Sequence, residues 1–241
     1  MRHAELSIIV ASLRPGQLEK CLESIEHHTA NVDYEVVVIA PFPVCPRPRL
    51  VYIPEIEPIG MYVAVNMGFA RAQGKYIINI PDDARATLNW AANMLAFMKP
   101  HDTEIFEGNF RHFDLINGER PEPGYYGKLY APFFCIRKAV AIRIGGLMRT
   151  CYHRFFGDPD LSMRVWFSNG AVATCPDAWV YHNDCKDRVY QNGYDKYFAT
   201  DRDTFMWRWQ PVYGRSREVP VSLPVKRMVP FALPPTEGLV L

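Results

Sequence analysis

The sequence predicts an α/β fold of the Rossmann-like, nucleotide-binding type, with a mixed, mainly parallel sheet flanked by helices. Two observations predict it. Short, almost wholly apolar segments at residues 6–10, 35–40 and 76–80 are typical of strands that are covered on both faces. Segments with apolar residues at helical spacing alternate with them over residues 1–100, which indicates parallel pairing through crossover connections.

Each element of the first half has its own signal. A polar turn follows the strand at residues 6–10, and Pro15 suits the first turn of a helix because a proline N–H is not needed there. Apolar positions at helical spacing predict helices over residues 18–25, 61–72 and 88–98. The strands expected between them lie at residues 35–40, 50–53 and 76–80.

The second half has a different pattern. Residues 103–120 indicate extended segments joined by a turn at Asn117-Gly118, and residues 129–136 form a further apolar stretch. Helices are expected at residues 138–144, 160–167 and 195–209, and short strands at residues 171–174 and 179–181. Prolines are frequent over residues 214–241, which favours an arm without regular packing. We therefore expect one domain at residues 1–213, in halves 1–100 and 101–213, followed by this arm.

Composition excludes several classes of protein. The 241 residues are 49% hydrophobic and 22% charged, and the formal charge of +1 gives no indication of a nucleic-acid partner. No apolar run reaches the roughly 18 residues of a membrane span, and the N-terminus leaves no room for a signal peptide before the first strand. The six cysteines match no zinc motif, so we expect reduced thiols in a cytoplasmic protein. Dinucleotide-binding and P-loop motifs are also missing from the sequence.

Two adjacent carboxylates, Asp82 and Asp83, follow the apolar strand at residues 76–80. Open α/β sheets bind ligands at the carboxyl ends of their strands. Two carboxylates repel each other unless a cation or a shared proton lies between them, which favours a metal ion here. The alternative is an Asx turn in which one aspartate caps the next helix, and both readings hold together if the other aspartate binds metal.

Asp158, Asp160 and His182 also end strand-like runs or precede a helix. Carboxylate and imidazole ligands suit Mg²⁺ or Mn²⁺ when water and phosphate oxygens complete the shell, and a carboxylate that is not tied to the metal can act as a general base. The structural alternatives are that Asp158 and Asp160 cap a helix and that His182 has no ligand role.

The order of these segments resembles that of the family 2 glycosyltransferases, nucleotide-diphospho-sugar transferases with the GT-A fold. The similar segments cover most of the chain: the first strand with Ala11 to Arg14, Asn66-x-Gly68, Ala72-x-Gly74-x-Tyr76, Pro81-Asp82-Asp83, Phe134 to Lys138, Phe156 to Arg164, Val180-Tyr181-His182 and Phe205 to Trp209. The glutamine of the processive synthases is replaced by Phe205, so the resemblance is to non-processive members.

The resemblance implies an inverting transfer of one sugar from a nucleotide-sugar donor to a hydroxyl of a glycan or lipid-linked glycan. Asp83 and His182 would hold a divalent metal, Mn²⁺ or Mg²⁺, and Asp158 would be the general base. The donor nucleotide would contact Ala11, Ser12, Arg14, Asn66 and Asp82. Tyr152, Phe156 and Asp160 would lie on the acceptor side, so that residues 1–100 form the nucleotide-binding half and residues 101–213 the acceptor half.

The sequence departs from the family pattern where Ala40, Pro81 and Gly157 replace acidic residues. Two alternatives therefore stay open: a glycosyltransferase-like binding protein with little or no activity, and a sugar nucleotidyltransferase. Aromatic residues from Tyr125 to Phe134 are expected either to stack on a sugar or to pack in the core. Four basic residues of the arm leave open a peripheral contact with the inner face of a membrane: Arg215, Arg217, Lys226 and Arg227.

Overall fold

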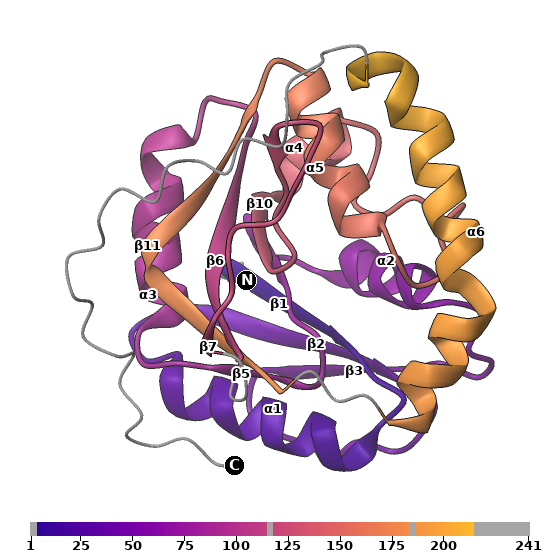
Figure 1. Cartoon of the computed structure of the whole chain (residues 1–241). Coiled ribbons are helices and arrows are strands. Elements are labelled where there is room, and N and C mark those ends of the chain that lie inside the picture. The colour runs from indigo at the N-terminus through magenta and orange to yellow at the C-terminus, as the bar shows by residue number, and fades with distance from the viewer. Residues whose placement is uncertain (1–3, 115–117, 184–186, 215–241) are drawn as a thin grey trace.

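The computed structural model describes residues 4–114, 118–183 and 187–214 (Figure 1). Its first part contains β1 (Leu6–Ala11), α1 (Pro15–His28), β2 (Tyr34–Ala40), β3 (Leu50–Pro54), α2 (Met61–Arg71), β4 (Tyr76–Asn79), β5 (Ala84–Ala86), α3 (Trp90–Met98) and the 3₁₀ turn η1 (Lys99–His101). The second part contains β6 (Phe106–Asp114), β7 (Gly118–Glu119), β8 (Gly124–Tyr125), β9 (Lys128–Leu129), β10 (Phe134–Arg137), α4 (Lys138–Arg143), α5 (Gly157–Phe167), β11 (Ala171–His182) and α6 (Arg188–Tyr213).

The main sheet has the strand order β3-β2-β1-β4-β10-β6-β11-β5, and β7 pairs with β6. β3, β2, β1 and β4 are parallel, so their carboxyl ends meet at one edge of the sheet. β10 runs antiparallel to both β4 and β6, which makes the sheet mixed. The predicted fold class, a mixed and mainly parallel sheet flanked by helices, is confirmed.

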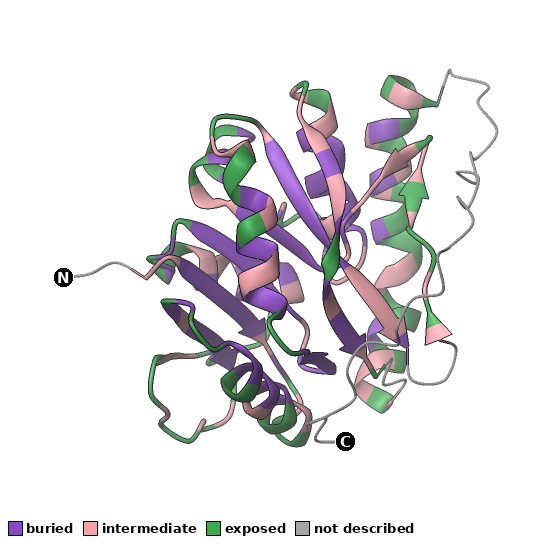
Figure 2. Ribbon diagram, turned by 90° about the vertical axis from the view of Figure 1, so that its left-hand side faces the viewer, coloured by how far each residue is buried: buried purple, intermediate pink, exposed green. Residues whose placement is uncertain are grey.

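Helices cover both faces of the sheet, because side chains alternate along each buried strand. Leu6, Ile8 and Val10 of β1 pack in a cluster with α1 and α3 on one face. Ile9 packs on the opposite face, in a second cluster that includes residues of α2, α4, α5 and α6. Figure 2 shows the resulting pattern, with buried strands at the centre and exposed outer helix surfaces.

No helix separates β2 from β3, in agreement with the sequence prediction. Four features differ from that prediction. β5, and not a helix, follows Asp83 directly. α5 begins at Gly157 rather than at residue 160, since Pro159 is tolerated in a first helical turn. The two short strands expected at residues 171–181 are one strand, β11, with an irregularity between Cys175 and Trp179.

The start of α6 is the fourth difference. The aromatic pattern predicts a helix from residue 195, but α6 begins at Arg188 because the Asp187 side chain accepts a hydrogen bond from the Tyr190 N–H and caps the helix. The extra turns matter for function, since they lie over the carboxyl ends of the parallel strands (Figure 1).

Other expectations have mixed outcomes. The hairpin expected at residue 117 is supported by the antiparallel pairing of β6 with β7, although residues 115–117 lie outside the described residues. Cys21, Cys45, Cys135, Cys151 and Cys175 are free thiols, and Cys185 lies outside the described part. Among the described helices, none combines the length and the hydropathy needed to cross a membrane. Residues 215–241, most of the expected arm, are also outside the description, and the division into halves remains a prediction.

Candidate active site

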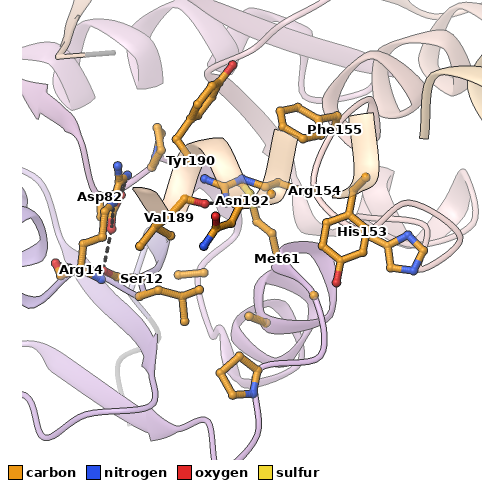
Figure 3. Close-up of a pocket in the computed structure, with 18 of the residues that line it drawn as sticks. Ser12, Arg14, Met61, Asp82, His153, Arg154, Phe155, Val189, Tyr190 and Asn192 are labelled. Atoms are coloured by element: carbon orange, nitrogen blue, oxygen red, sulfur yellow. Dashed lines mark hydrogen bonds and ion pairs between the residues drawn. The ribbon is translucent and has the colours of Figure 1, made fainter. Parts of the chain in front are cut away.

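A cavity of about 580 Å³ lies at the carboxyl ends of the parallel strands. Its floor comes from Ala11, Ser12 and Arg14 after β1, and from Asp82 and Asp83 after β4. The remaining lining comes from the segment after β3, the start of α2, the loop at residues 153–155, His182 at the end of β11 and the first turns of α6. Figure 3 shows Val189, Tyr190 and Asn192 of α6 lying across the cavity from Ser12 and Arg14.

Asp82 is held by the turn that follows β1. The Ser12 hydroxyl donates to one carboxylate oxygen of Asp82 at 2.6 Å, and Arg14 Nε donates to the same oxygen at 3.0 Å. Ser12 also accepts a hydrogen bond from the Arg14 N–H at 3.0 Å, which closes the turn locally. Ser12, Arg14 and Asp82, all expected at the donor, therefore form one buried unit (Figure 3).

Asp83 lies between two basic side chains. Its carboxylate is 3.0 Å from the Arg14 guanidinium and 3.3 Å from His182 Nε2. Pairing of β5 with β11 places His182 beside Ala84, which brings the imidazole to Asp83 from a distant part of the sequence. Burial would raise the pKa of Asp83, but His182 and Arg14 outweigh that effect and hold the pKa well below its ordinary value. Asp83 is therefore ionised at neutral pH.

Arg14 resolves the repulsion that the adjacent carboxylates imply. Its guanidinium pairs with Asp82 and Asp83 and lies 3.6 Å from Asp187 at the start of α6. Burial would lower the pKa of Arg14, and the two carboxylates raise it instead, so the cation is permanent. The alternative in which one aspartate caps a following helix is wrong, because β5 follows and the cap of α3 is Asn89.

Arg85, which no sequence pattern singled out, binds the backbone of the segment that carries Asp82 and Asp83. Its guanidinium donates to the backbone carbonyls of Asp82 at 3.0 Å and Ala84 at 2.8 Å, and to the Gln17 side chain at 2.7 Å. The side chain is 6% exposed. Arg85 therefore fixes the backbone that carries both aspartates.

The residues expected to bind a divalent metal ion fit such an ion only in part. Within the described residues, no three His, Cys, Asp or Glu side chains come together as a metal-binding group. Asp83 and His182 do meet, and an ionised carboxylate with an imidazole suits Mg²⁺ or Mn²⁺ when phosphate and water oxygens supply the other ligands. The two side chains thus fit an ion that is bound largely by its ligand's diphosphate.

Asp158 lies in the first turn of α5, beyond the cavity wall, and is not among the residues that line the cavity. The Tyr62 hydroxyl donates to it at 3.3 Å and accepts from the Gly157 N–H at 2.8 Å. Burial raises the pKa of Asp158 to about 7, despite the opposing effect of hydrogen bonds from its own backbone N–H and from the Tyr62 hydroxyl. A carboxylate with this pKa can take up a proton near neutral pH, as a general base must.

Partly exposed tyrosines surround Asp158. Burial, and next the charge of Asp158, raise the pKa values of Tyr125 and Tyr130. The two rings stack with their centroids 5.5 Å apart. Phe133 and Phe134 are core residues, whereas Tyr125, Tyr126 and Tyr130 retain partial exposure. The aromatic segment therefore divides between core packing and a surface next to Asp158.

Asp160, two residues further along α5, is in a different environment. Its carboxylate is fully buried and accepts hydrogen bonds from Arg164 at 2.9 Å, Trp209 at 3.0 Å and Tyr152 at 3.1 Å. Arg149 and Arg208 lie within 3.8 Å. Asp160 therefore ties α5 to α6 and to the preceding loop.

Tyr152 and Phe156, expected at the acceptor, and Asn66, expected at the donor, pack against other parts of the protein and do not line the cavity. Tyr152 is 1% exposed, and Phe156 is 7% exposed and packs on Phe198 and Phe205. The Asn66 amide donates to and accepts from the backbone of Met148, so it holds a loop against α2. Neither Asn66 nor the three acceptor candidates line the cavity, and we do not propose them as substrate contacts.

Asp201 of α6 was missed by the sequence reasoning. It is fully buried, and its carboxylate accepts hydrogen bonds from the backbone N–H groups of His153, Arg154 and Phe155 at 2.9–3.1 Å. These bonds fix the cavity wall that leads into Asp158. Arg154 in that wall donates to the Val189 carbonyl at 2.7 Å and so joins the wall to α6 (Figure 3).

Comparison with known proteins shows which sequences and folds this chain resembles. Residues 43–156 match the family described as glycosyl transferase family 2. No curated protein sequence matches the chain. Solved structures with a similar fold include GalNAc-T7 with UDP, GalNAc and Mn²⁺ (TM-score 0.64, 12% identity), covering 84% of this chain and 50% of that one.

Two further structures have the same likeness. TarS of S. aureus in complex with UDP-GlcNAc matches with a TM-score of 0.59 and 13% identity over 78% of this chain and 60% of its own. The mannosyltransferase PcManGT of Pyrobaculum calidifontis, with GDP-Man and Mn²⁺, matches with a TM-score of 0.60 and 15% identity over 79% and 60%. This chain spans about half to three fifths of the length of these three proteins. The chain therefore resembles the family 2 glycosyltransferases over residues 43–156, and the shared fold confirms the predicted GT-A fold.

Proposed function

We propose that this protein is an inverting glycosyltransferase that moves one sugar from a nucleotide-sugar donor to a hydroxyl of a glycan or lipid-linked glycan. The observation that carries the proposal is the pairing of an ionised Asp83 with His182 and Arg14 in a cavity, together with a carboxylate, Asp158, whose pKa is near neutrality. Similar folds hold UDP-GlcNAc in TarS and GDP-Man with Mn²⁺ in PcManGT, which supports the substrate class.

On the donor side, two arginine side chains line the part of the cavity where the proposed reaction requires a diphosphate. Arg14 and Arg154 both line the cavity, and the charge of Arg14 is among the effects that lower the pKa of Arg154, after burial. Two nearby guanidinium groups in a partly buried cavity favour an anionic ligand. A divalent ion held by Asp83 and His182 would stabilise negative charge on the leaving diphosphate. Ala11 and Ser12 then border the donor at the end of β1.

On the acceptor side, Asp158 accepts the proton of the attacking hydroxyl. The Tyr62 hydroxyl donates to that carboxylate and is itself held by the Gly157 N–H, and Asp201 fixes the loop before Asp158. Tyr125 and Tyr130 supply ring faces on which a sugar acceptor can pack. Attack on the anomeric carbon from the side opposite the diphosphate inverts its configuration.

A second candidate is a binding protein with the same fold and little transfer activity. The pairing of Arg14 with both Asp82 and Asp83 favours it, because the guanidinium already neutralises the carboxylates that would otherwise hold a metal. A sugar nucleotidyltransferase has no comparable support in the site. The two surviving candidates differ in turnover and not in ligand.

A panel of nucleotide sugars tests the proposal. The protein is mixed with each donor and Mn²⁺, and thermal stability and donor hydrolysis are measured. We expect at least one donor to raise the melting temperature in a metal-dependent way and to be hydrolysed slowly. Asp83→Ala should lose the metal-dependent stabilisation, whereas Glu57→Gln, an exposed control outside the cavity, should keep it. Stabilisation without hydrolysis or transfer supports the binding protein, and no stabilisation by any donor contradicts both candidates.

A further inference from the structure

Glu55 is a buried carboxylate in the cavity that the proposed reaction does not use. It follows β3, lines the cavity and is 5% exposed. Its backbone N–H donates to the Ala40 carbonyl at 2.9 Å, which extends the pairing of β2 and β3 by one residue and fixes its place. Its carboxylate makes no hydrogen bond or ion pair with the residues that the structure describes, and burial alone raises its pKa.

The carboxylate oxygens of Glu55 remain accessible from the cavity, so a ligand there can supply the hydrogen-bond donors that the described residues do not. A carboxylate accepts hydrogen bonds from O–H and N–H groups and repels phosphate. Glu55 is therefore suited to a part of the ligand that carries hydroxyl or ring N–H donors. By the same reasoning it does not belong to the end of the cavity that receives the diphosphate.

The strand order gives the distance between these two ends. β3 and β4 are separated by β2 and β1, so Glu55 and the Asp82-Asp83 pair are three strand spacings apart. At about 4.8 Å for each spacing, this is roughly 14 Å across the sheet. Such a separation prevents Glu55 from sharing an ion with Asp83. An extended nucleoside diphosphate can span it, with its diphosphate at Asp83 and its nucleoside at β3.

We propose that Glu55 binds the nucleoside of the donor, by accepting hydrogen bonds from its ribose hydroxyls or from the N–H groups of its base. This inference rests on the proposed function and adds to it a residue that selects the nucleotide. Pro58 and Gly60, which follow on the same segment, border the same part of the cavity.

Calorimetric titration of nucleoside diphosphates and of inorganic pyrophosphate tests the assignment. UDP, GDP, CDP and ADP are titrated, with Mg²⁺, into the wild type, Glu55→Gln and the exposed control Glu57→Gln. Glu55→Gln should weaken the preferred nucleoside diphosphate roughly 10-fold to 100-fold, the range for a lost hydrogen bond to a charged group. The affinity of Glu55→Gln for pyrophosphate should equal that of the wild type. Glu57→Gln should bind both ligands with wild-type affinity.

The pyrophosphate titration also reports folding, because a disrupted cavity would lose both ligands. The 2′,3′-dideoxy form of the preferred nucleotide distinguishes ribose hydroxyls from base N–H groups as the hydrogen-bond donors. If Glu55 binds the ribose, Glu55→Gln and the wild type should bind the dideoxy form with equal affinity. If Glu55 binds the base, Glu55→Gln should bind the dideoxy form more weakly than the wild type does. Equal affinity of Glu55→Gln and wild type for every nucleoside diphosphate overturns the assignment, as does an equal loss of pyrophosphate. A wild type that binds pyrophosphate but no nucleoside diphosphate overturns the proposed function as well.

Discussion

Two pairs of aspartates, Asp82 with Asp83 and Asp158 with Asp160, have different electrostatic environments. Asp82 and Asp83 are both buried, Arg14 forms ion pairs with both, and His182 lies 3.3 Å from Asp83. Among the described residues, Asp158 has no cation beside it and accepts from the Tyr62 hydroxyl and a backbone N–H. Burial consequently raises the pKa of Asp158, whereas His182 and Arg14 lower the pKa of Asp83.

Asp160 differs from Asp158 in its contacts with basic side chains. It is more buried than Asp158 and only two residues away, yet arginines surround it and three side chains donate hydrogen bonds to it. A buried carboxylate with cations is a structural or ligand-binding anion, and a buried carboxylate without cations is a proton acceptor. The neighbours of each aspartate, and not its residue type, therefore assign its role.

Asp158→Asn should have the largest effect on function. An amide cannot accept the proton of the acceptor hydroxyl, so we expect transfer to fall about 10²-fold to 10⁴-fold, the usual contribution of a general base. Nucleotide affinity should change little, because Asp158 does not line the cavity. Steady-state kinetics and titration with the nucleoside diphosphate measure the two quantities. Loss of both together would show that Asp158 is structural and would remove the contrast with Asp160.

Asp160→Ala should have the largest effect on stability. The substitution leaves the buried Arg164 guanidinium without its carboxylate, and breaking a buried pair in this way costs about 3–5 kcal/mol. Urea unfolding of the variant, compared with Asp158→Ala, gives the difference in free energy of unfolding. A variant as stable as the wild type would mean that the arginines around Asp160 do not depend on it.

Glu107 of β6 provides a third buried carboxylate near α5. Burial raises its pKa from an ordinary 4.5 to about 8, although Ser162 and Arg164 act in the opposite direction. Between these two values the folded state holds a proton that the unfolded state has lost, so the free energy of unfolding should fall with rising pH by up to several kcal/mol and level off above pH 8. Melting temperatures from pH 5 to 9 should show this slope, and Glu107→Gln should flatten it. An unchanged slope in the variant would assign the effect to another group, such as Asp158.

The smallest of the expected effects is the change in transfer rate with pH. Only ionised Asp158 can act as a base, so the rate should rise about tenfold per pH unit below pH 7 and then reach a plateau. The ionisation of Asp83 should not contribute to this slope, since the pKa of Asp83 is held far lower. A rate that is flat between pH 5 and 8 would argue against Asp158 as the base.

Much of the fold was predictable because its signals are local. The apolar segments at residues 6–10 and 76–80 became β1 and β4, and Pro15 opens α1 as its missing N–H suggested. The errors arose where a proline or a cap hid a boundary, at Pro159 in α5 and at Asp187 before α6. β5 was missed because three residues are too few for a periodic pattern.

The candidate site was predictable only in part. The carboxyl ends of β1 and β4 were expected to carry ligand-binding residues, and Ser12, Arg14, Asp82 and Asp83 do line one cavity. Sequence context also singled out His182 and Asp158, to which the family resemblance gave roles, and His182 lines the cavity whereas Asp158 does not. Asn66, Tyr152, Phe156 and Asp160 had the right sequence context but do not line the cavity, since a motif does not indicate which way a side chain points.

The sequence by itself determined the order of strands and helices and the position of two carboxylates after a buried strand, because hydrophobic periodicity and turn residues act over a few positions. Tertiary structure alone decided the neighbours of each acid. Arg14 meets Asp82 across 68 residues of sequence, and β5–β11 pairing brings His182 to Asp83. Ionisation depends on charges and burial within a few ångströms, which are set by contacts between distant segments. The roles of Asp83, Asp158 and Asp160 therefore became distinct only when the chain had folded.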